Sequence, residues 1–508
     1  MEYETTEKCS ALQWLTAEQT VGKKHPYLFS QCQAIHARTM LPCQDTPAIK
    51  ATYSAIVHVS DPLAVVMSAN RRKEVLPSPI KGKRTFEFEL TQPIPSYLIA
   101  IGAGAIVSKE IGPRSSVYCE QEVLDAAAYE FAETESFIKT GEELVGPYVW
   151  ERYDILLLPP SFPFGGMENS CLTFLTPSLL CGDRSLVDVV AHEISHSWTG
   201  NLVSCVNWEH FWLNEGFTMF LERKILSRLH GESWRQFNSI IGLADLRESV
   251  AQFNNDGPET ALVPDLTSTD PDDVFSTVPY EKGHTLLYTL EELVGGPAVF
   301  EPFFKAHIQK FAGQSIDSHQ FREFILEYYS NNMQVNMKLQ HFDWDMWYYG
   351  RGMPPTIPYY NDELLVPCCR LSTAWLEGSK SINHAEFHSM SPAQKVMFVD
   401  LLLLHAHKLD ASSVKELDEV YKLSSSSNVE ILLKWFLLGI RSKSEFTYEK
   451  AATFATKHGR MKYCRPILRE LYASGECGKQ LALETFKSHR AFYHPIASQM
   501  IAKDLHLN

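Results

Sequence analysis

The stretch V-V-A-H-E-I-S-H-S-W-T-G-N-L-V-S-C-V-N-W-E-H-F-W-L-N-E, residues Val189 to Glu215, decides how the chain folds around its site. On a helix, His192 and His196 lie one turn apart on the same face. Two neutral imidazoles so placed can bind one zinc ion, and Glu193 supplies a carboxylate beside them. The H-E-x-x-H pattern alone also arises by chance in helical sequence.

A third ligand follows the histidines in the motif N-E-G. Gly200 and Asn201 are suited to end the first helix, and Asn207 or Trp208 to begin a second one that returns antiparallel. Glu215 would then join the two histidines. Three protein ligands leave a fourth position for water, which is the mark of a catalytic zinc site.

Glu222 lies two turns beyond Glu215 on the same helical face. It can orient a ligand histidine through a hydrogen bond. A solvated helix carboxylate is an equally good reading of this residue.

Composition excludes several classes of protein. The 508 residues are enough for about two to four domains, and contents of 45% hydrophobic and 21% charged residues are ordinary for a globular protein. A formal charge of −15 argues against a nucleic-acid surface. No apolar run reaches transmembrane length, and the start lacks a signal-peptide pattern. Eleven scattered cysteines form no disulfide framework, so we expect a cytoplasmic protein with reduced thiols.

The periodicity of apolar residues changes along the chain. Thr85 to Leu90 alternates as a strand does, helical spacing begins near Glu120, and Asp154 to Leu158 forms a short apolar strand. We expect an α+β multidomain fold: an N-terminal β-domain (1–105), a mostly helical catalytic domain (106–350), a Pro-rich linker (351–365) and a C-terminal helical, solenoid-like domain (366–508).

Four further passages accompany the zinc stretch: Q-C-Q-A at Gln31–Ala34, P-S-F-P-F-G-G-M-E-N at Pro160–Asn169, V-P-Y-E-K-G at Val278–Gly283 and G-R-M-K at Gly459–Lys462. Together they resemble the gluzincin aminopeptidase family over nearly the whole chain, and most closely its branch that hydrolyses leukotriene A(4). The resemblance implies a thermolysin-like catalytic domain that holds one Zn²⁺ through His192, His196 and Glu215.

The resemblance also implies roles in peptide cleavage. Glu193 would act as general base and Tyr280 would stabilise the oxyanion. The peptide's amino terminus would be read by Gln33 and Glu168, and the neighbouring motif residues Gly165, Gly166, Met167 and Asn169 would also bind substrate. Alone, Tyr280 would be one of 21 tyrosines.

For a fatty-acid epoxide, the resemblance assigns Asp272 to direct water, although D-P-D-D is also typical of a helix-capping turn. Arg460 and Lys462 would receive the carboxylate of lipid or peptide, and their spacing favours a loop or helix end. The residues implied for an apolar tunnel, which core packing explains equally well, are Phe164, Met167, Trp208 and Phe211. Phe164 and Phe275 replace tyrosines of the family, so each keeps a ring and loses a hydroxyl.

The family's β-domain is longer than the segment that precedes Glu120, so we expect the chain to begin inside that domain. The leading hypothesis is a monomeric, bifunctional zinc enzyme that cleaves short peptides with a free amino terminus and hydrolyses the epoxide leukotriene A(4). The alternatives are an aminopeptidase only, of the aminopeptidase B kind, and a zinc-binding protein inactivated by the shortened β-domain. No nucleic-acid partner and no membrane span are expected.

Overall fold

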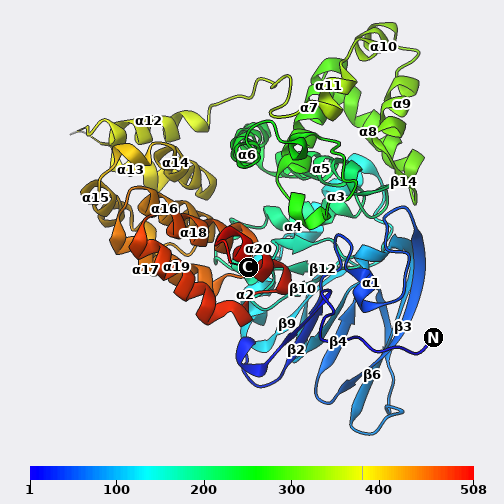
Figure 1. Ribbon diagram of the computed structural model, residues 1–508. Helices are drawn as coiled ribbons and strands as arrows, with labels where there is room; N and C mark the ends of the chain where they lie inside the picture. The colour runs from blue at the N-terminus through cyan, green and yellow to red at the C-terminus, as the bar shows by residue number, and fades with distance from the viewer. Residues whose placement is uncertain (380–381, 508) are drawn as a thin grey trace.

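The computed structural model describes residues 1–379 and 382–507. Figure 1 shows three regions: blue N-terminal strands at the lower right, cyan-to-green central elements, and yellow-to-red C-terminal helices on the left. The expected α+β architecture is confirmed.

Two antiparallel sheets make up the N-terminal region. One has the order β1-β2-β7-β4 and the other the order β3-β6-β5. Their strands are β1 (Leu12–Leu15), β2 (Tyr27–Ser30), β3 (Lys50–Ser60), β4 (Ala64–Met67), β5 (Asn70–Glu74), β6 (Lys83–Pro95) and β7 (Ile101–Gly104), and one short helix, α1 (Ala37–Met40), lies between β2 and β3.

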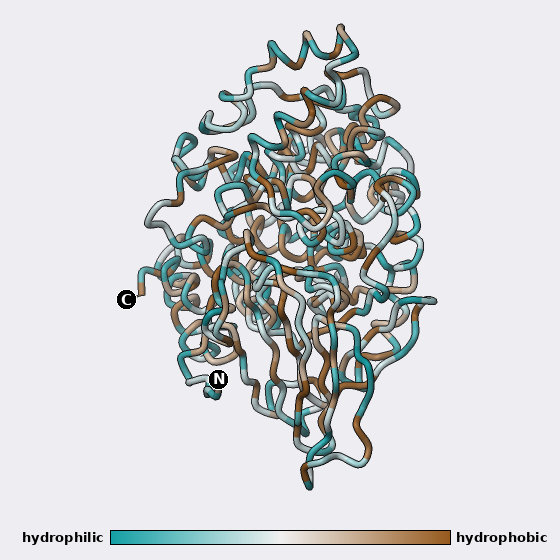
Figure 2. The backbone as a smooth tube through the Cα atoms, turned by 90° about the vertical axis from the view of Figure 1, so that its right-hand side faces the viewer, coloured by the Kyte–Doolittle hydropathy of each residue, from teal (hydrophilic) through white to brown (hydrophobic). Residues whose placement is uncertain are grey.

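Strand β6 follows the alternation read from the sequence. Phe86, Phe88 and Leu90 are buried, whereas Glu87 and Glu89 face outward. A strand that presents one apolar and one polar face fixes its register, because a slip of one residue would expose the whole apolar set. In Figure 2 the strand-rich lower end accordingly alternates between hydrophobic and hydrophilic segments.

The central region has a mixed five-stranded sheet of order β11-β12-β10-β9-β8. Strand β10, predicted from its apolar run, pairs in parallel with both β9 and β12. Parallel strands buried on both faces read as continuous apolar runs. The strands are β8 (Ile106–Gly112), β9 (Ser115–Glu120), β10 (Asp154–Leu157), β11 (Gly166–Met167) and β12 (Leu172–Leu175), so strand structure continues beyond residue 105.

Helices cover this sheet and form most of the central region. They are α2 (Leu124–Glu130), α3 (Thr134–Val145), α4 (Asp188–His196), α5 (Trp212–His230), α6 (Glu232–Gln252), α7 (Gly283–Val294), α8 (Pro297–Phe311), α9 (Ser318–Tyr328), α10 (Met333–Gln340) and α11 (Trp344–Tyr349), with the short pair β13 (Ser204–Cys205) and β14 (Ser315–Ile316). Helix α5 packs against α4, α6 and α7. It is therefore the central helix of this region.

Nine helices form the described part of the C-terminal region: α12 (Leu365–Leu376), α13 (His384–Ser389), α14 (Pro392–Leu404), α15 (Ala411–Tyr421), α16 (Val429–Arg441), α17 (Tyr448–Lys457), α18 (Met461–Ala473), α19 (Glu476–His489) and α20 (Pro495–Asp504). Helices α12, α14, α16, α18 and α20 pack in succession, and α17 packs on α19. This layered succession confirms the solenoid-like prediction.

Residues 350–364, all of which the structure describes, contain no helix or strand and connect the last two regions. Their backbone is nevertheless anchored, because the Lys282 ammonium donates to the carbonyls of Gly350 and Gly352. Within the described residues no helix is long and apolar enough to cross a membrane.

Candidate metal centre and active site

Helices α4 and α5 bring the three predicted ligands together. The Nε2 atoms of His192 and His196 lie 3.2 Å apart. Glu215 Oε2, from the first turn of α5, lies 3.4 Å from the first nitrogen and 3.2 Å from the second.

The segment between the helices makes this possible. Helix α4 ends at His196, and the chain then turns through Gly200, whose φ of +130° is one that side chains rarely tolerate. Asn207 caps a 3-10 turn, η5 (Trp208–His210), by accepting from the Glu209 amide. Gly200, predicted to end the first helix, therefore lies in the turn, and Asn207, predicted to begin the second, is the cap of η5.

The donor set fits a zinc ion. Glu215 Oε2 is buried and has no hydrogen-bond partner among the described residues, although a buried acceptor is normally satisfied. Despite burial, the two imidazoles lower the pKa of the Glu215 carboxyl, which keeps it a carboxylate. Two imidazole nitrogens and one carboxylate oxygen around a common point are the ligand set of a catalytic zinc site.

Both histidines are oriented by hydrogen bonds on their other ring nitrogen. His192 Nδ1 donates to Glu222 Oε2 at 2.9 Å, and His196 Nδ1 donates to the Thr199 carbonyl at 2.9 Å. Such bonds fix the tautomer that leaves Nε2 free for metal. Of the two readings of Glu222, the structure supports the orienting one.

Glu193 is buried beside the ligands, and its Oε2 has no hydrogen-bond partner in the described chain. Burial raises the pKa of its carboxyl. Gly166 of β11 crosses directly over it: a Cβ at Gly166 would lie 2.2 Å from Glu193 Oε1. The second glycine of the G-G-M-E-N motif therefore provides the space that Glu193 occupies.

Glu168 and Gln33 line the same cavity as the metal ligands. Glu168 Oε1 and Gln33 Nε2 are buried without hydrogen-bond partners among the described residues. The backbone of Glu168 is fixed because its carbonyl accepts from Asn201 Nδ2 at 2.7 Å.

Met167 and Asn169, named with Glu168 in the sequence analysis, are placed differently. Neither lines the two cavities described below. Met167 is buried in the core, where its sulfur accepts from Gln31 Nε2 at 3.2 Å. The structure gives Met167 a packing position rather than a place in the apolar tunnel, because alternate residues of the strand face opposite sides.

Tyr280 lies on a π-helical turn, η8 (Val278–Lys282). Its ring stacks on His192 with centroids 6.1 Å apart, and the edges of Phe211 and Phe275 contact it. Burial raises the pKa of its phenol well above the usual value, and the surrounding carboxylates raise it further. Tyr280 is therefore a neutral donor beside the metal ligands.

Two cavities share Gln33, Phe164 and Phe275 in their linings. The larger, of about 540 Å³, contains the metal ligands and extends between α6 and the C-terminal helices. The smaller, of about 60 Å³, is mostly apolar and is lined by Trp208 and Phe211 among others.

Asp272 lines the smaller cavity from η7 (Pro271–Val274). The cap of this turn is Asp270, whose Oδ1 accepts from the Asp272 amide at 3.0 Å. Asp272 itself accepts from His36 Nε2 at 2.7 Å. The capping reading therefore applies to Asp270 and not to Asp272.

Arg460 is the residue before α18 and Lys462 lies in its first turn, so the predicted helix end is confirmed. Both line the larger cavity. Gly165 admits the guanidinium, since a Cβ there would lie 2.5 Å from Arg460 Nη2. Glu430 Oε1 accepts from Lys462 Nζ at 2.8 Å, and the two cations lower the pKa of Glu430 to about 2 despite its burial.

Comparisons with known proteins agree with this geometry. The sequence model described as the peptidase family M1 domain matches residues 129–347, that of the M1 N-terminal domain matches 1–98, and that described as leukotriene A4 hydrolase, C-terminal, matches 390–505. Leukotriene A-4 hydrolase of Xenopus laevis is 46% identical, covering 99% of this chain and 83% of its own length. The chain belongs to peptidase family M1.

Other M1 relatives include leucine aminopeptidase 2 of Aspergillus terreus, 44% identical over 99% of this chain and 81% of its own length. A solved structure of yeast LTA4 hydrolase in complex with bestatin superposes with a TM-score of 0.92 at 39% identity, covering 99% of this chain and 81% of that one. The resemblance to the leukotriene-hydrolysing branch is thereby confirmed. This M1 protein is a zinc-dependent hydrolase of the metallopeptidase class.

Several contacts of the M1 site could not be found from the sequence. Thr199 contributes a backbone carbonyl, which no side-chain pattern reveals. Glu430 is thirty-two residues from Lys462 and has no motif around it. His36 does have a signal, because it lies two residues beyond the quoted Q-C-Q-A motif.

Proposed function

We propose that this protein is a zinc aminopeptidase that also hydrolyses the epoxide of leukotriene A(4). The observation that carries the peptidase proposal is the buried, unpartnered Glu168 Oε1 in the same cavity as the metal ligands. A buried carboxylate oxygen without a donor is costly. The ammonium group of a peptide's amino terminus supplies that missing donor.

The larger cavity has groups for both ends of a short peptide. Glu168 and Gln33 receive the amino terminus, while Arg460 and Lys462, which line the same cavity, receive the terminal carboxylate. Guanidinium and ammonium groups are the usual partners of a carboxylate. This arrangement favours short peptides with a free amino terminus.

The residues around the metal divide the chemistry of peptide cleavage. When bound by His192, His196 and Glu215, zinc supplies an acidified water and polarises the scissile carbonyl. Glu193 takes the proton of the attacking water and delivers it to the leaving amine. Tyr280 donates a hydrogen bond to the oxyanion of the tetrahedral intermediate.

The smaller cavity supports the lipid activity. Its apolar walls suit a hydrocarbon chain, and Asp272 places a carboxylate among them. In this proposal Asp272 orients the water that adds at a distant carbon when the epoxide opens. Phe164 and Phe275, whose centroids lie 5.7 Å apart, keep the cavity lined by rings without hydroxyl groups.

An aminopeptidase without lipid activity is the second candidate. The relatives named leucine aminopeptidase 2 favour it, as do the two phenylalanines that lack the family's hydroxyl groups. A zinc-binding protein inactivated by a shortened β-domain stays an alternative hypothesis, and a monomeric state and a cytoplasmic location stay predictions of the sequence.

The test uses one preparation for both reactions. Purified protein is assayed with alanyl and arginyl arylamides, with and without chelator, and with leukotriene A(4) followed by product analysis. Bestatin, bound in the yeast relative, serves as a competing ligand. Chelator-sensitive arylamide cleavage supports the peptidase; its absence in zinc-loaded protein contradicts it. Arylamide cleavage without any dihydroxy lipid product beyond that formed in a protein-free control selects the second candidate.

A further inference from the structure

A buried ion pair joins the zinc helix to the turn that carries Tyr280. Arg223 of α5 donates from Nη1 and Nη2 to the two carboxylate oxygens of Glu281 at 2.8 Å each. Their side chains are only 4% and 9% exposed. Two parallel charge-assisted bonds fix direction as well as distance, unlike a single contact.

Helix α5 thus uses consecutive residues for two parts of the site. Glu222 orients the ligand His192, and Arg223 holds the residue next to Tyr280. Helix α5 therefore positions both the metal ligand His192 and the turn that carries the Tyr280 phenol.

Close backbone packing reinforces this connection. A Cβ at Gly216 would lie 2.7 Å from the Cα of Gly283, so α5 and the start of α7 touch without side chains between them. A Cβ at Gly242 of α6 would lie 2.1 Å from Glu281 Oε2 and 2.5 Å from Arg223 Nη2. The ion pair therefore fills a notch that only glycine leaves open.

Lys282, the next residue of the turn, is anchored as well. Its Nζ donates to the carbonyls of Thr260, Gly350 and Gly352 at 2.8 to 2.9 Å. Tyr280 is consequently followed by two anchored residues of the π-helical turn, Glu281 and Lys282.

We propose that Arg223 and Glu281 are positioning residues that hold the Tyr280 hydroxyl where the oxyanion forms. This inference rests on the proposed role of Tyr280. Arg223 lines neither cavity, so it acts on a bound peptide only through Glu281 and the turn. A misplacement of about 1 Å by a residue remote from the chemistry can cost about 100-fold in rate.

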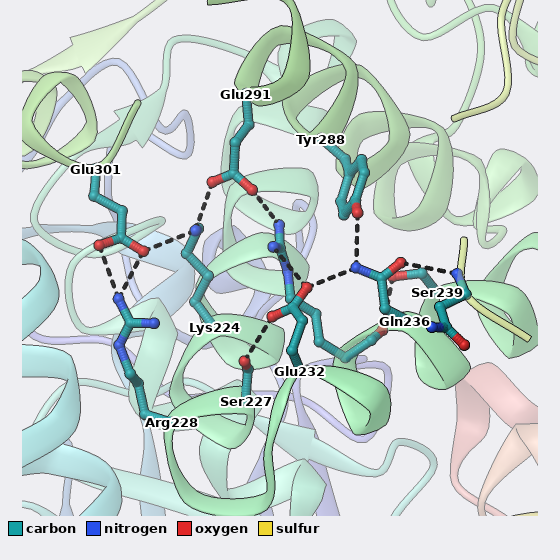
Figure 3. Close-up of polar contacts among 11 residues, drawn as sticks. Lys224, Ser227, Arg228, Glu232, Gln236, Ser239, Tyr288, Glu291 and Glu301 are labelled. Atoms are coloured by element: carbon teal, nitrogen blue, oxygen red, sulfur yellow. Dashed lines mark hydrogen bonds and ion pairs between the residues drawn. The ribbon is translucent and has the colours of Figure 1, made fainter. Parts of the chain in front are cut away.

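A second buried network on the same helices provides a matched control. Figure 3 shows Lys224, Glu291, Glu301 and Arg228 joined by ion pairs. Arg235 of α6 donates to Glu291 at 2.6 Å, with side chains 2% and 0% exposed. Glu291 lies in the third turn of α7, which begins after the turn that carries Tyr280, and neither Glu291 nor Arg235 lines either of the two cavities.

The experiment compares Arg223→Lys with Arg235→Lys in zinc-loaded protein. Each keeps its charge and loses the forked geometry. We expect Arg223→Lys to lower kcat for a peptide by about 10- to 100-fold while KM changes by less than about twofold. Arg235→Lys should leave both constants within about twofold, whatever its melting temperature. Affinity for a tetrahedral peptide phosphonate should fall with kcat, whereas affinity for the product peptide should not.

Combination with Tyr280→Phe separates positioning from general damage. If Arg223 acts through Tyr280, Arg223→Lys should change kcat by less than about threefold in the Tyr280→Phe background. Independent, multiplying losses would overturn the inference, as would an equal loss in Arg235→Lys. A wild-type kcat for Tyr280→Phe alone would instead overturn the role of Tyr280. Glu281→Gln, which keeps the shape of its side chain, replaces Arg223→Lys in the same cycle if that variant does not fold.

Discussion

His36 Nε2 lies 2.7 Å from Asp272 Oδ2, although the two residues are 236 positions apart in the chain. His36 precedes α1 in the N-terminal region, and its Nδ1 lies 2.7 Å from Ser10 Oγ. The N-terminal region therefore fixes one carboxylate oxygen of Asp272, which lines the smaller cavity. In the proposed epoxide reaction the other oxygen, Oδ1, would orient the water.

Asp272→Asn should separate the two proposed reactions. All groups assigned to peptide cleavage lie around the metal, so arylamide turnover should stay within about threefold of wild type. Conversion of leukotriene A(4) should be lost or redirected, because the amide cannot orient water as the carboxylate does. Both are measured on one preparation.

Asp273→Asn is the matched control, since Asp273 is half exposed and pairs with Lys503 on the surface. It should retain both activities. A parallel loss of both activities and of melting temperature in Asp272→Asn would indicate a structural role for Asp272 instead.

The contact with Asp272 should also make stability depend on pH. Burial lowers the pKa of His36, but the hydrogen bond and charge of Asp272, with Asp270 and Asp45, raise it overall above 6.5. Because the pKa of His36 is higher in the folded than in the unfolded chain, protonated His36 stabilises the fold. This contribution is complete at pH values below the unfolded pKa of 6.5, and it is lost as pH rises through the folded pKa. The unfolding free energy of wild type relative to His36→Gln should therefore decrease as pH rises above about 6.5. A difference that is constant between about pH 5 and 9 would contradict the charge of His36.

Zinc binding should depend on ligands and on their partners to different degrees. His196→Ala removes one of three protein ligands and should abolish stoichiometric zinc and all activity. Glu222→Gln keeps the ligands but weakens the orientation of His192, so zinc affinity should fall by about 10- to 100-fold. Metal analysis after dialysis against graded chelator distinguishes them. One zinc ion per chain in the His196→Ala variant would refute the assignment of His196 as a ligand.

Glu193→Gln should keep the zinc and lose peptide turnover by about two to four orders of magnitude, the usual contribution of a positioned general base. The amide has the shape of the carboxylate but cannot accept the proton. Metal content and kcat are measured together. Near-normal turnover in a zinc-loaded variant would point to another base.

The sequence predicted the helices and strands that follow from local residue patterns. It missed the contacts that arise only when distant parts of the chain pack together. The alternation of Thr85 to Leu90 and the turn spacing of His192 and His196 are periodicities, so strand and helix followed directly. For Met167 the sequence leaves the tunnel and core packing equally open, and the structure decides for the face of β11 that packs into the core. Glu430 and His36 reach the site only through packing between regions, which one sequence does not display.

Each glycine of the pair in the G-G-M-E-N motif accommodates a different functional side chain. A Cβ at Gly166 would lie 2.2 Å from Glu193 Oε1, and one at Gly165 would lie 2.5 Å from Arg460 Nη2. Both neighbours are ends of side chains, so each can move and the fold should persist. Gly166→Ala should displace the general base and lower kcat by about 10- to 100-fold.

Gly165→Ala should instead displace Arg460, which binds the terminal carboxylate in the proposed complex. KM for a tripeptide should rise by about tenfold, whereas an arylamide without that carboxylate should be cleaved with nearly unchanged constants. Steady-state kinetics of both variants on both substrates measure this, and zinc content and melting temperature control for folding. The reverse outcome, with kcat lost in Gly165→Ala and retained in Gly166→Ala, would show that the two glycines do not serve Arg460 and Glu193 separately.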